Sequence, residues 1–212
     1  MPVSLGSYLA PFGQIDVYLF DQLLKGRVGP EARVLDAGCG GGRNLELLLR
    51  HGVDVYGVDR DAAALARARA LAAEVAPATL VALPAAERFQ VAEIGALPYA
   101  GAAFDFVICN ALLHFAPDEV VFDAWVDDLW RVLRRGGTLF ARLASDIGLE
   151  DGVRRLAGRW SKLPDGTERF LVDEALLLAT GERLRATLLD PIKTTNVQSL
   201  RCMTTWVLRK DA

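Results

Sequence analysis

Apolar and polar positions alternate along the first two thirds of the chain in blocks that predict strands and helices in turn. Short apolar runs predict five strands, the third of them weaker than the others, at 34–36, 53–58, 89–92, 104–109 and 138–143. Segments with apolar residues at steps of three and four predict helices at 45–49, 61–76 and 117–134. Because strands and helices alternate, residues 30–145 predict a parallel sheet covered by helices on both faces.

The remainder of the chain has a different pattern. Residues 146–169 are polar and interrupted by glycine, and we predict no regular element there. A short helix is expected at 172–180. Two long strands are expected at 184–192 and 201–209, close enough in sequence to form an antiparallel hairpin that closes the sheet.

The N-terminal part is expected to hold a short helix that ends at 20–25, preceded by a flap at 4–18. Tyr8, Phe12 and Tyr18 either close over a ligand from this flap or pack as ordinary helix anchors. The sequence has no internal repeat, low-complexity tract or linker, so its 212 residues are expected to form a single domain.

Composition narrows the range of partners. The formal net charge of −3 and a pI near 5.5 give no overall basic field, so we expect neither nucleic acid nor membrane as a partner. No apolar run approaches the ~20 residues of a membrane span, and residues 1–13 do not resemble a signal peptide, so a cytoplasmic location is expected. The three cysteines, Cys39, Cys109 and Cys202, form no CxxC pair, which argues against disulfides and a metal site.

A glycine cluster follows the first predicted strand. Residues 36–42 read Asp-Ala-Gly-Cys-Gly-Gly-Gly and precede a predicted helix. Glycine lets the backbone approach a ligand, and a helix start offers free N–H groups, so a nucleotide-like ligand is expected here. The alternative is a turn that needs glycine only for its backbone angles. The spacing is GxGxG rather than the GxGxxG of dinucleotide folds, which disfavours NAD and FAD.

An acidic residue ends the second predicted strand. Asp59 can accept both hydroxyls of a ribose, and Arg60 beside it can lie against the adenine. The alternative is that Asp59 caps the following helix, a role that Asp61 serves equally well.

The motifs occur in an order that resembles the class I S-adenosylmethionine (SAM)-dependent methyltransferases. The resemblance covers residues 30–145, and its motifs are 34–42, Asp59, Leu97-Pro98-Tyr99 with 104–107, and 133–137. It implies a Rossmann-like, seven-stranded, mostly parallel sheet with SAM lying across the strand ends where strand order reverses. It also implies four parts: a flap and helix (1–29), a SAM-binding core (30–145), an acceptor-side segment (146–182) and a closing hairpin (183–212).

The resemblance also implies roles for single residues. Asp36 would hold the glycine loop or the amino group of the methionine part, and Asp59 would bind the ribose. Glu93 stands where the family often has an Asp that accepts from the adenine. The residues expected to contact the cofactor are Asp36, Gly38, Cys39, Gly40, Asn44, Asp59, Arg60, Glu93, Ile94 and Asn110.

Residues 41–44 and 201–206 further resemble the small tellurite-resistance and thiol-type methyltransferases, which suggests a small, soft or anionic acceptor. Methyl transfer from a sulfonium needs positioning and a dry pocket, and a base only if the nucleophile is protonated. His114, after the fourth strand, is the candidate base, or alternatively a packing or capping residue. His51 is interpreted as a helix cap, and Cys39 and Cys109 as packing groups.

Basic residues from 154 to 169 alternate with acidic ones, which is typical of a solvated surface, although this segment and Trp160 fall where the family builds acceptor pockets. The sequence therefore predicts a SAM-dependent methyltransferase acting on a small molecule. The alternatives are a non-catalytic SAM-binding module and, less favoured, a nicotinamide-dependent oxidoreductase.

Overall fold

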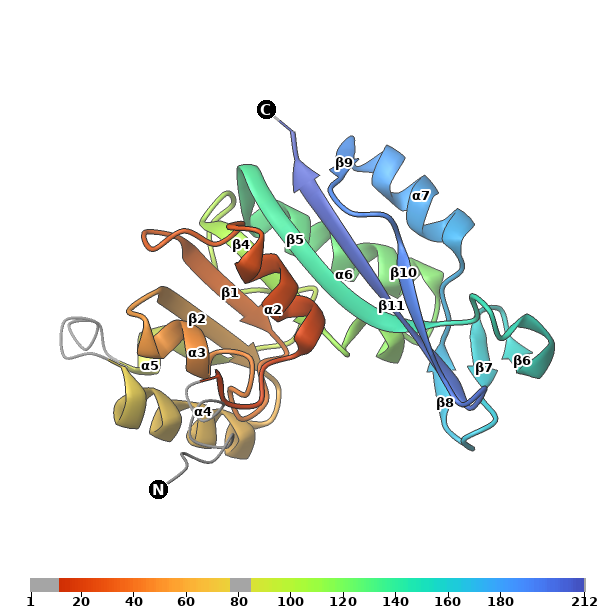
Figure 1. The fold of residues 1–212 in the computed structure, drawn as a ribbon, viewed down its shortest axis with the longest axis horizontal. Helices are drawn as coiled ribbons and strands as arrows, with labels where there is room; N and C mark the ends of the chain where they lie inside the picture. The colour runs from red at the N-terminus through yellow and green to blue at the C-terminus, as the bar shows by residue number, and fades with distance from the viewer. Residues whose placement is uncertain (1–11, 77–84, 212) are drawn as a thin grey trace, which may run out of the picture.

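The computed structural model describes residues 12–76 and 85–211, and its centre is one mixed sheet (Figure 1). Seven strands follow the order β10-β11-β5-β4-β1-β2-β3. The five strands from β5 to β3 are parallel, while β11 runs antiparallel to β5. Their bounds are β1 (Arg33–Ala37), β2 (Asp54–Asp59), β3 (Phe89–Val91), β4 (Phe104–Asn110), β5 (Leu133–Ser145), β10 (Lys193–Val197) and β11 (Arg201–Lys210). The Rossmann-like sheet and its closing hairpin are confirmed.

The hairpin differs from the prediction in its first strand. The expected strand at 184–192 is wrong, because two shorter strands, β9 (Ala186–Leu188) and β10, pair with opposite ends of β11. Between them Pro191 has no N–H to donate to a ladder. Asp190 turns instead to the residues that follow α2 (Val17–Leu24), where it pairs with Arg27 and Lys25 at 2.7 and 3.1 Å.

Helices cover both faces of the sheet, as predicted. One apolar cluster joins α2 (Val17–Leu24), α3 (Glu46–Arg50) and α4 (Ala62–Val75) to the sheet, and a second joins α6 (Glu119–Val132) and α7 (Glu174–Arg183) to the opposite face. In Figure 1, α2 lies in front of the sheet and α6 behind it. A short helix, α5 (Ala85–Arg88), leads into β3.

Aspartate caps set the helix starts. Asp16, Asp61, Asp118 and Asp173 each accept from a backbone N–H in the first turn of α2, α4, α6 and α7. Helix α7 therefore begins at Glu174, after the predicted 172. Helix α6 stops at Val132 rather than at the predicted 134, because β5 begins at Leu133 and shifts register against β4 before Thr138.

A second sheet occupies the segment in which no element was predicted. Three short antiparallel strands form it: β6 (Arg154–Ala157), β7 (Trp160–Lys162) and β8 (Glu168–Phe170). Phe170 is fully buried and stacks on Phe122 of α6 with ring centroids 5.1 Å apart. In Figure 1 this small sheet lies beside the C-terminal end of β5 and the N-terminal end of β11, so it can form one side of a site there.

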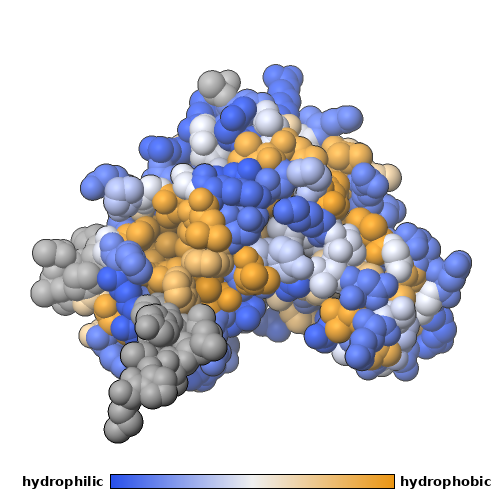
Figure 2. Space-filling model, viewed as in Figure 1, coloured by the Kyte–Doolittle hydropathy of each residue, from blue (hydrophilic) through white to orange (hydrophobic). Residues whose placement is uncertain are grey.

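Apolar side chains gather over α2 and α3 in Figure 2. They line a groove of about 480 Å³ between Phe12, Phe20, Leu47 and Val53. Phe12 packs edge-on against Phe20, as a helix anchor would. None of the helices in the described ranges is long and apolar enough to cross a membrane. Tyr8 and most of the predicted flap lie outside the described residues.

Candidate functional site

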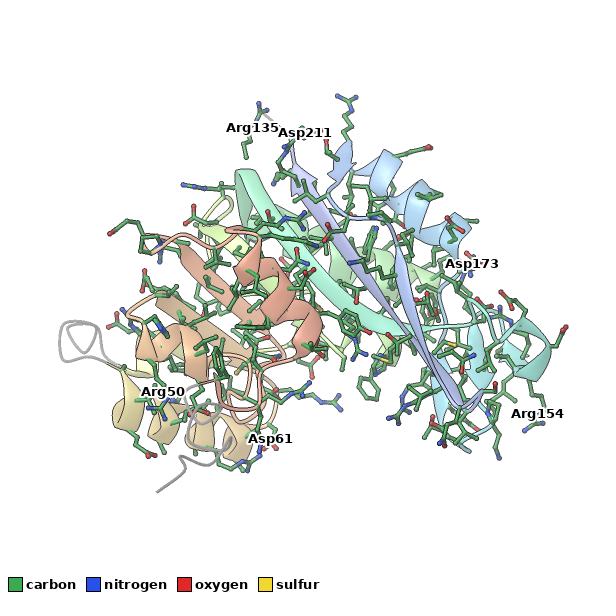
Figure 3. The ribbon with its side chains drawn as sticks, in the orientation of Figure 1. Arg50, Asp61, Arg135, Arg154, Asp173 and Asp211 are labelled. Carbon is green, nitrogen blue, oxygen red and sulfur yellow. The ribbon has the colours of Figure 1, made fainter. Side chains whose placement is uncertain are left out.

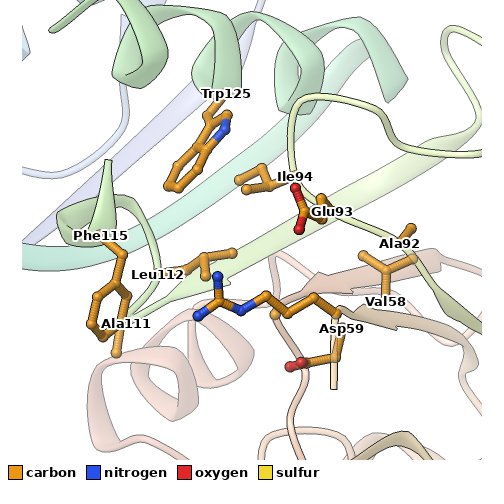
Figure 4. A pocket seen from close by; sticks show the side chains of 11 residues that line it. Val58, Asp59, Ala92, Glu93, Ile94, Ala111, Leu112, Phe115 and Trp125 are labelled. Carbon is orange, nitrogen blue, oxygen red and sulfur yellow. The ribbon is translucent and has the colours of Figure 1, made fainter. Parts of the chain in front are cut away.

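A pocket of about 290 Å³ opens at the carboxyl ends of β1, β2 and β4. This is where strand order reverses in the sheet, the usual place for ligands in open α/β folds. Figure 4 shows Glu93 and Ile94 on one side of the pocket and Ala111 and Phe115 on the other. Its lining residues are Gly38, Val58, Asp59, Arg60, Ala92, Glu93, Ile94, Ala111, Leu112, Phe115 and Trp125.

The glycine turn is held close to β2. The backbone N–H groups of Gly38 and Cys39 both donate to the Val58 carbonyl, at 2.8 and 3.0 Å. Gly38 has φ +80°, and a Cβ there would lie 2.8 Å from the Cδ2 atom of Leu112. Glycine is therefore required at 38 by its backbone angle and by the narrow space.

Asp59 ties the turn to the next helix. Its carboxylate accepts from the Gly40 N–H at 2.8 Å and from the Asp61 N–H at 2.9 Å. Each carboxylate oxygen retains a second lone pair, and Asp59 lines the pocket, so it can also accept from a ligand hydroxyl. Asp61 caps α4 through the Ala63 N–H, which leaves Asp59 free of that role.

Two buried polar side chains at the strand ends lack partners among the described residues. Both carboxylate oxygens of Asp36 and both amide atoms of Asn110 are buried without a hydrogen bond. Burial raises the pKa of Asp36 to about 7, although the charge of Arg43 opposes the shift. A buried polar group without a partner costs stability, so such groups mark a place for a polar ligand.

The other predicted contacts divide into two groups. Gly38, Asp59, Arg60, Glu93 and Ile94 all line the pocket. Two further residues are placed elsewhere in the structure. Cys39 is buried against Gly57, and burial raises the pKa of its thiol. The Asn44 amide oxygen accepts from the Asp16 N–H at 3.1 Å, at the start of α2.

The apolar wall of the pocket was not predicted from the sequence. Leu112, Phe115 and Trp125 form it, and Trp125 lies on α6, within the helix predicted at 117–134. Leu112 precedes the short 3-10 helix η3 (Leu113–Phe115), Phe115 ends it, and both come after Ala111 at φ +60°. Because Ala111 follows β4 in a left-handed conformation, the chain turns there into the site. The turn could not be predicted from the sequence, because it contains no glycine.

A second pocket of about 290 Å³ adjoins the first, and Ala111 lines both. The two pockets also meet at Phe115 and Arg169. The guanidinium of Arg169, which lines the second pocket, lies 4.8 Å from the ring centroid of Phe115, which lines the first. The residues that line the second pocket are Ala111, His114, Arg142, Ala144, Leu163, Asp165, Thr167, Arg169, Val197, Arg201 and Met203.

His114 is buried in the wall of this second pocket. Its Nδ1 atom accepts from the Ala144 N–H at 3.2 Å, which places the proton of the neutral ring on Nε2. Burial and the charge of Arg169 lower its pKa to about 4, so the ring is neutral near pH 7. In this state Nε2–H donates a hydrogen bond and cannot take a proton.

The comparisons with known proteins agree with this geometry. A family model described as a methyltransferase domain matches residues 35–141, slightly more than half of the chain. The chain belongs to the class I SAM-dependent methyltransferases. Its cofactor is accordingly SAM. The further likeness to tellurite-resistance or thiol-type members stays a prediction.

Relatives support the family assignment. The malonyl-[acyl-carrier protein] O-methyltransferase of Enterobacter lignolyticus is 35% identical over 68% of this chain and 51% of its own length. The ubiquinone biosynthesis O-methyltransferase of Psychrobacter arcticus is 37% identical over 50% of this chain and 38% of its own. The chain thus spans about half, or less, of the length of these relatives.

A solved SAM-dependent methyltransferase from Clostridium acetobutylicum has the same fold, with a TM-score of 0.69 at 14% identity. The alignment covers 92% of this chain and 90% of that one. The sheet, its strand order and the hairpin are therefore those of a methyltransferase fold.

The methyltransferase pocket fits SAM. The unpartnered Asp36 and Asn110 match a cationic amino group and a carboxylate, the two ends of the methionine part. Asp59 offers acceptors for ribose hydroxyls, and Ile94, Leu112 and Trp125 offer an apolar lining for a purine. His51 caps α3, with its Nδ1 atom 2.8 Å from the Leu47 carbonyl, as the sequence predicts.

Proposed function

We propose that this chain transfers the methyl group of SAM to a small-molecule acceptor bound in the second pocket. The observation that supports this most is the contact of the two pockets at Ala111, since an acceptor must meet the methyl group directly. Two relatives are named as O-methyltransferases, which supports methyl transfer as the reaction.

SAM, when bound, supplies a methyl group on a positively charged sulfur. Asp36 and Asn110 would hold its methionine part, and Asp59 its ribose. Leu112, Phe115 and Trp125 would exclude water from the region between cofactor and acceptor. Catalysis would then rest on positioning and desolvation, as the sequence suggests.

Residues 146–182 supply part of the acceptor side in this proposal. The turn between β7 and β8 brings Leu163, Asp165 and Thr167 to the second pocket, and β8 brings Arg169. Trp160 packs against the central core instead.

His114 would act on the acceptor as a hydrogen-bond donor rather than as the base that the sequence suggests. Its Nδ1 atom is occupied by the Ala144 N–H, and its pKa of about 4 leaves little protonated ring to titrate near neutrality. We therefore expect kcat/KM to show no inflection from His114 between pH 6 and 8. An inflection in that range that disappears in His114→Gln would restore the role of base.

The test of the proposed function has two stages. Calorimetric titration with S-adenosylhomocysteine (SAH), the product of SAM, measures the cofactor site alone. Transfer of labelled methyl from SAM is then screened against carboxylic acids, phenols, thiols and chalcogen oxyanions. Absence of SAH binding overturns the proposal at its first stage. Binding with no transfer, or transfer only to a carrier-protein thioester, overturns the small-molecule acceptor.

A further inference from the structure

The second pocket holds more positive than negative charge. Three arginines line it from three separate elements: Arg142 on β5, Arg169 on β8 and Arg201 on β11. One carboxylate lines it, that of Asp165. The Asp165 carboxylate already accepts from the N–H and the hydroxyl of Thr167, at 2.9 and 2.6 Å. Arg201 reaches it only at 3.9 Å.

The arginines of the pocket retain free donors. Arg169 forms no ion pair with any described residue, and its Nη1 atom donates only to the backbone carbonyl of Glu168. Arg142 contacts Asp16 at 3.3 Å, while its Nε–H is buried without a partner. Its side chain is only 17% exposed, so water cannot fully solvate the guanidinium.

Neighbouring arginines behave differently, which argues against an ordinary charged surface. Arg159 pairs with Glu119 and Asp173 at 3.0 and 2.9 Å, and Arg155 pairs with Asp146. The segments 1–11 and 77–84 contain no Asp or Glu, so their side chains bring no further carboxylate to the pocket. Arg155 and Arg159 are thus paired with carboxylates, whereas Arg169 inside the pocket forms no ion pair with a described residue.

The remaining polar group of the wall has the same preference. His114 is neutral, and with Nδ1 occupied by the Ala144 N–H its Nε2–H is available to donate. The arginines donate through guanidinium forks, which match the geometry of a carboxylate. Donors gathered around excess positive charge select an anion and leave a cation or a neutral amide poorly paired.

We propose that the acceptor carries a carboxylate, which Arg169 and Arg201 bind in the second pocket, with Arg142 adding positive charge from the sheet. This inference rests on the proposed function, since it names the chemical class of the acceptor. The arginines are specificity-determining residues in this view. Loss of one such charged contact is expected to weaken binding of the acid by about tenfold or more.

The experiment measures binding separately from turnover. The SAH-loaded protein is titrated with hexanoate, benzoate and phenyl phosphate, and in parallel with hexanamide and benzamide, which have nearly the same shape as the acids without the charge. Each titration is repeated with Arg169→Gln, Arg201→Gln and the control Arg154→Gln. Arg154 lies on β6 of the same small sheet, is exposed, and projects away from the protein in Figure 3.

The expected result is binding of the acids over the amides, weakened in the two pocket variants and unchanged in Arg154→Gln. Higher salt should weaken the acids alone. Equal binding of acid and amide, no binding of either acid, or preference for phenyl phosphate over benzoate overturns the proposal. SAH affinity should be unchanged in all three variants. A protein that does not bind SAH overturns the proposed function instead, so the two failures are distinguishable.

Discussion

The two adjoining pockets recognise their ligands by different means. The cofactor pocket uses strand ends, a glycine turn held to the Val58 carbonyl, and small or apolar walls. The second pocket uses long side chains, with guanidinium groups from β5, β8 and β11. Binding in the first pocket depends on the positions of backbone groups. Binding in the second depends on the charge and length of side chains. Substitutions should therefore harm the first through geometry and the second through charge.

The largest effect is expected from Asp59→Ala, which should weaken ligand binding in the cofactor pocket and leave the second pocket unchanged. The change removes the hydrogen bonds that Asp59 accepts from the Gly40 N–H in the turn and from the Asp61 N–H before α4, together with the acceptors for a ribose. We expect SAH affinity to fall by about a hundredfold, because hydrogen bonds to charged groups contribute about 1.5–3 kcal/mol each.

Calorimetry with SAH measures this change, and Asp61→Ala is the matched control. Asp61 caps α4 two residues further on and points to solvent (Figure 3), so its loss should cost stability by about 1 kcal/mol. It should leave SAH affinity intact. Equal loss of affinity in both variants would mean that Asp59 acts only by ordering the start of α4.

A smaller effect, on stability, is expected from Gly38→Ala. The new Cβ would meet Leu112 at 2.8 Å at a backbone φ of +80°. Left-handed strain of about 1–2 kcal/mol adds to a smaller cost of moving the flexible end of the Leu112 side chain aside. Urea unfolding of the unliganded protein measures the sum.

Gly26→Ala separates these two contributions. Gly26 has φ +69°, and a Cβ there meets nothing within 4 Å, so only the strain applies. If the two glycine variants lose equal stability, the contact with Leu112 does not restrict the turn.

The next smaller effect is expected in the pH dependence of SAH affinity, which reports on the cofactor pocket alone. The pKa of Asp36 is raised to about 7, so its carboxyl is mostly protonated at pH 6 and mostly ionised at pH 8. In the proposed site the ionised form would pair with the amino group of SAH, so we expect affinity to fall about tenfold per pH unit below 7. In Asp36→Asn, binding should be weaker at pH 8 and nearly independent of pH. A steep pH dependence that survives this substitution would contradict the assignment.

The same shift has a consequence for folding. Since the folded-state pKa lies above the unfolded value of 3.8, the stabilisation from the Asp36 proton is full below pH 3.8 and lost as pH rises to 7. The unliganded Asp36→Asn protein should therefore lose less stability than the wild type across this range.

The smallest effect should come from the boundary that the pockets share. Phe115 of the cofactor pocket stacks under Arg169 of the second. A double-mutant cycle of Phe115→Leu and Arg169→Gln, read by thermal unfolding, should give a coupling of about 0.5–1 kcal/mol. Additive effects would mean that the two pockets are independent at this wall.

The sequence predicted the sheet and the cofactor pocket well because both depend on local patterns. Apolar runs predicted the strands. The GxGxG turn after the first strand and Asp59 at the end of the second predicted which strand ends line the pocket. Glu93 and Ile94 lie in the pocket wall for the same reason, since they follow β3 directly.

The second pocket could not be predicted in this way. Arg142, Arg169 and Arg201 are separated by 27 and 32 positions and meet only because β11 pairs with β5 and the small sheet stands beside them. The strands of that sheet have only three or four residues, too few for a periodic pattern. The family resemblance implies that Asn44 contacts the cofactor, whereas its contact with Asp16 depends on where α2 packs.

That contact restricts how acceptor preference can be changed. The Asn44 amide holds the backbone of Asp16 at 3.1 Å, and the carboxylate of Asp16 is the counter-ion of Arg142 at 3.3 Å. Arg142 is thus connected through α2 to the segment that follows the glycine turn, while Arg169 and Arg201 are not. Divergence or redesign toward a new acceptor can exchange Arg169 and Arg201 without touching this connection, but exchanging Arg142 would disturb the cofactor loop as well.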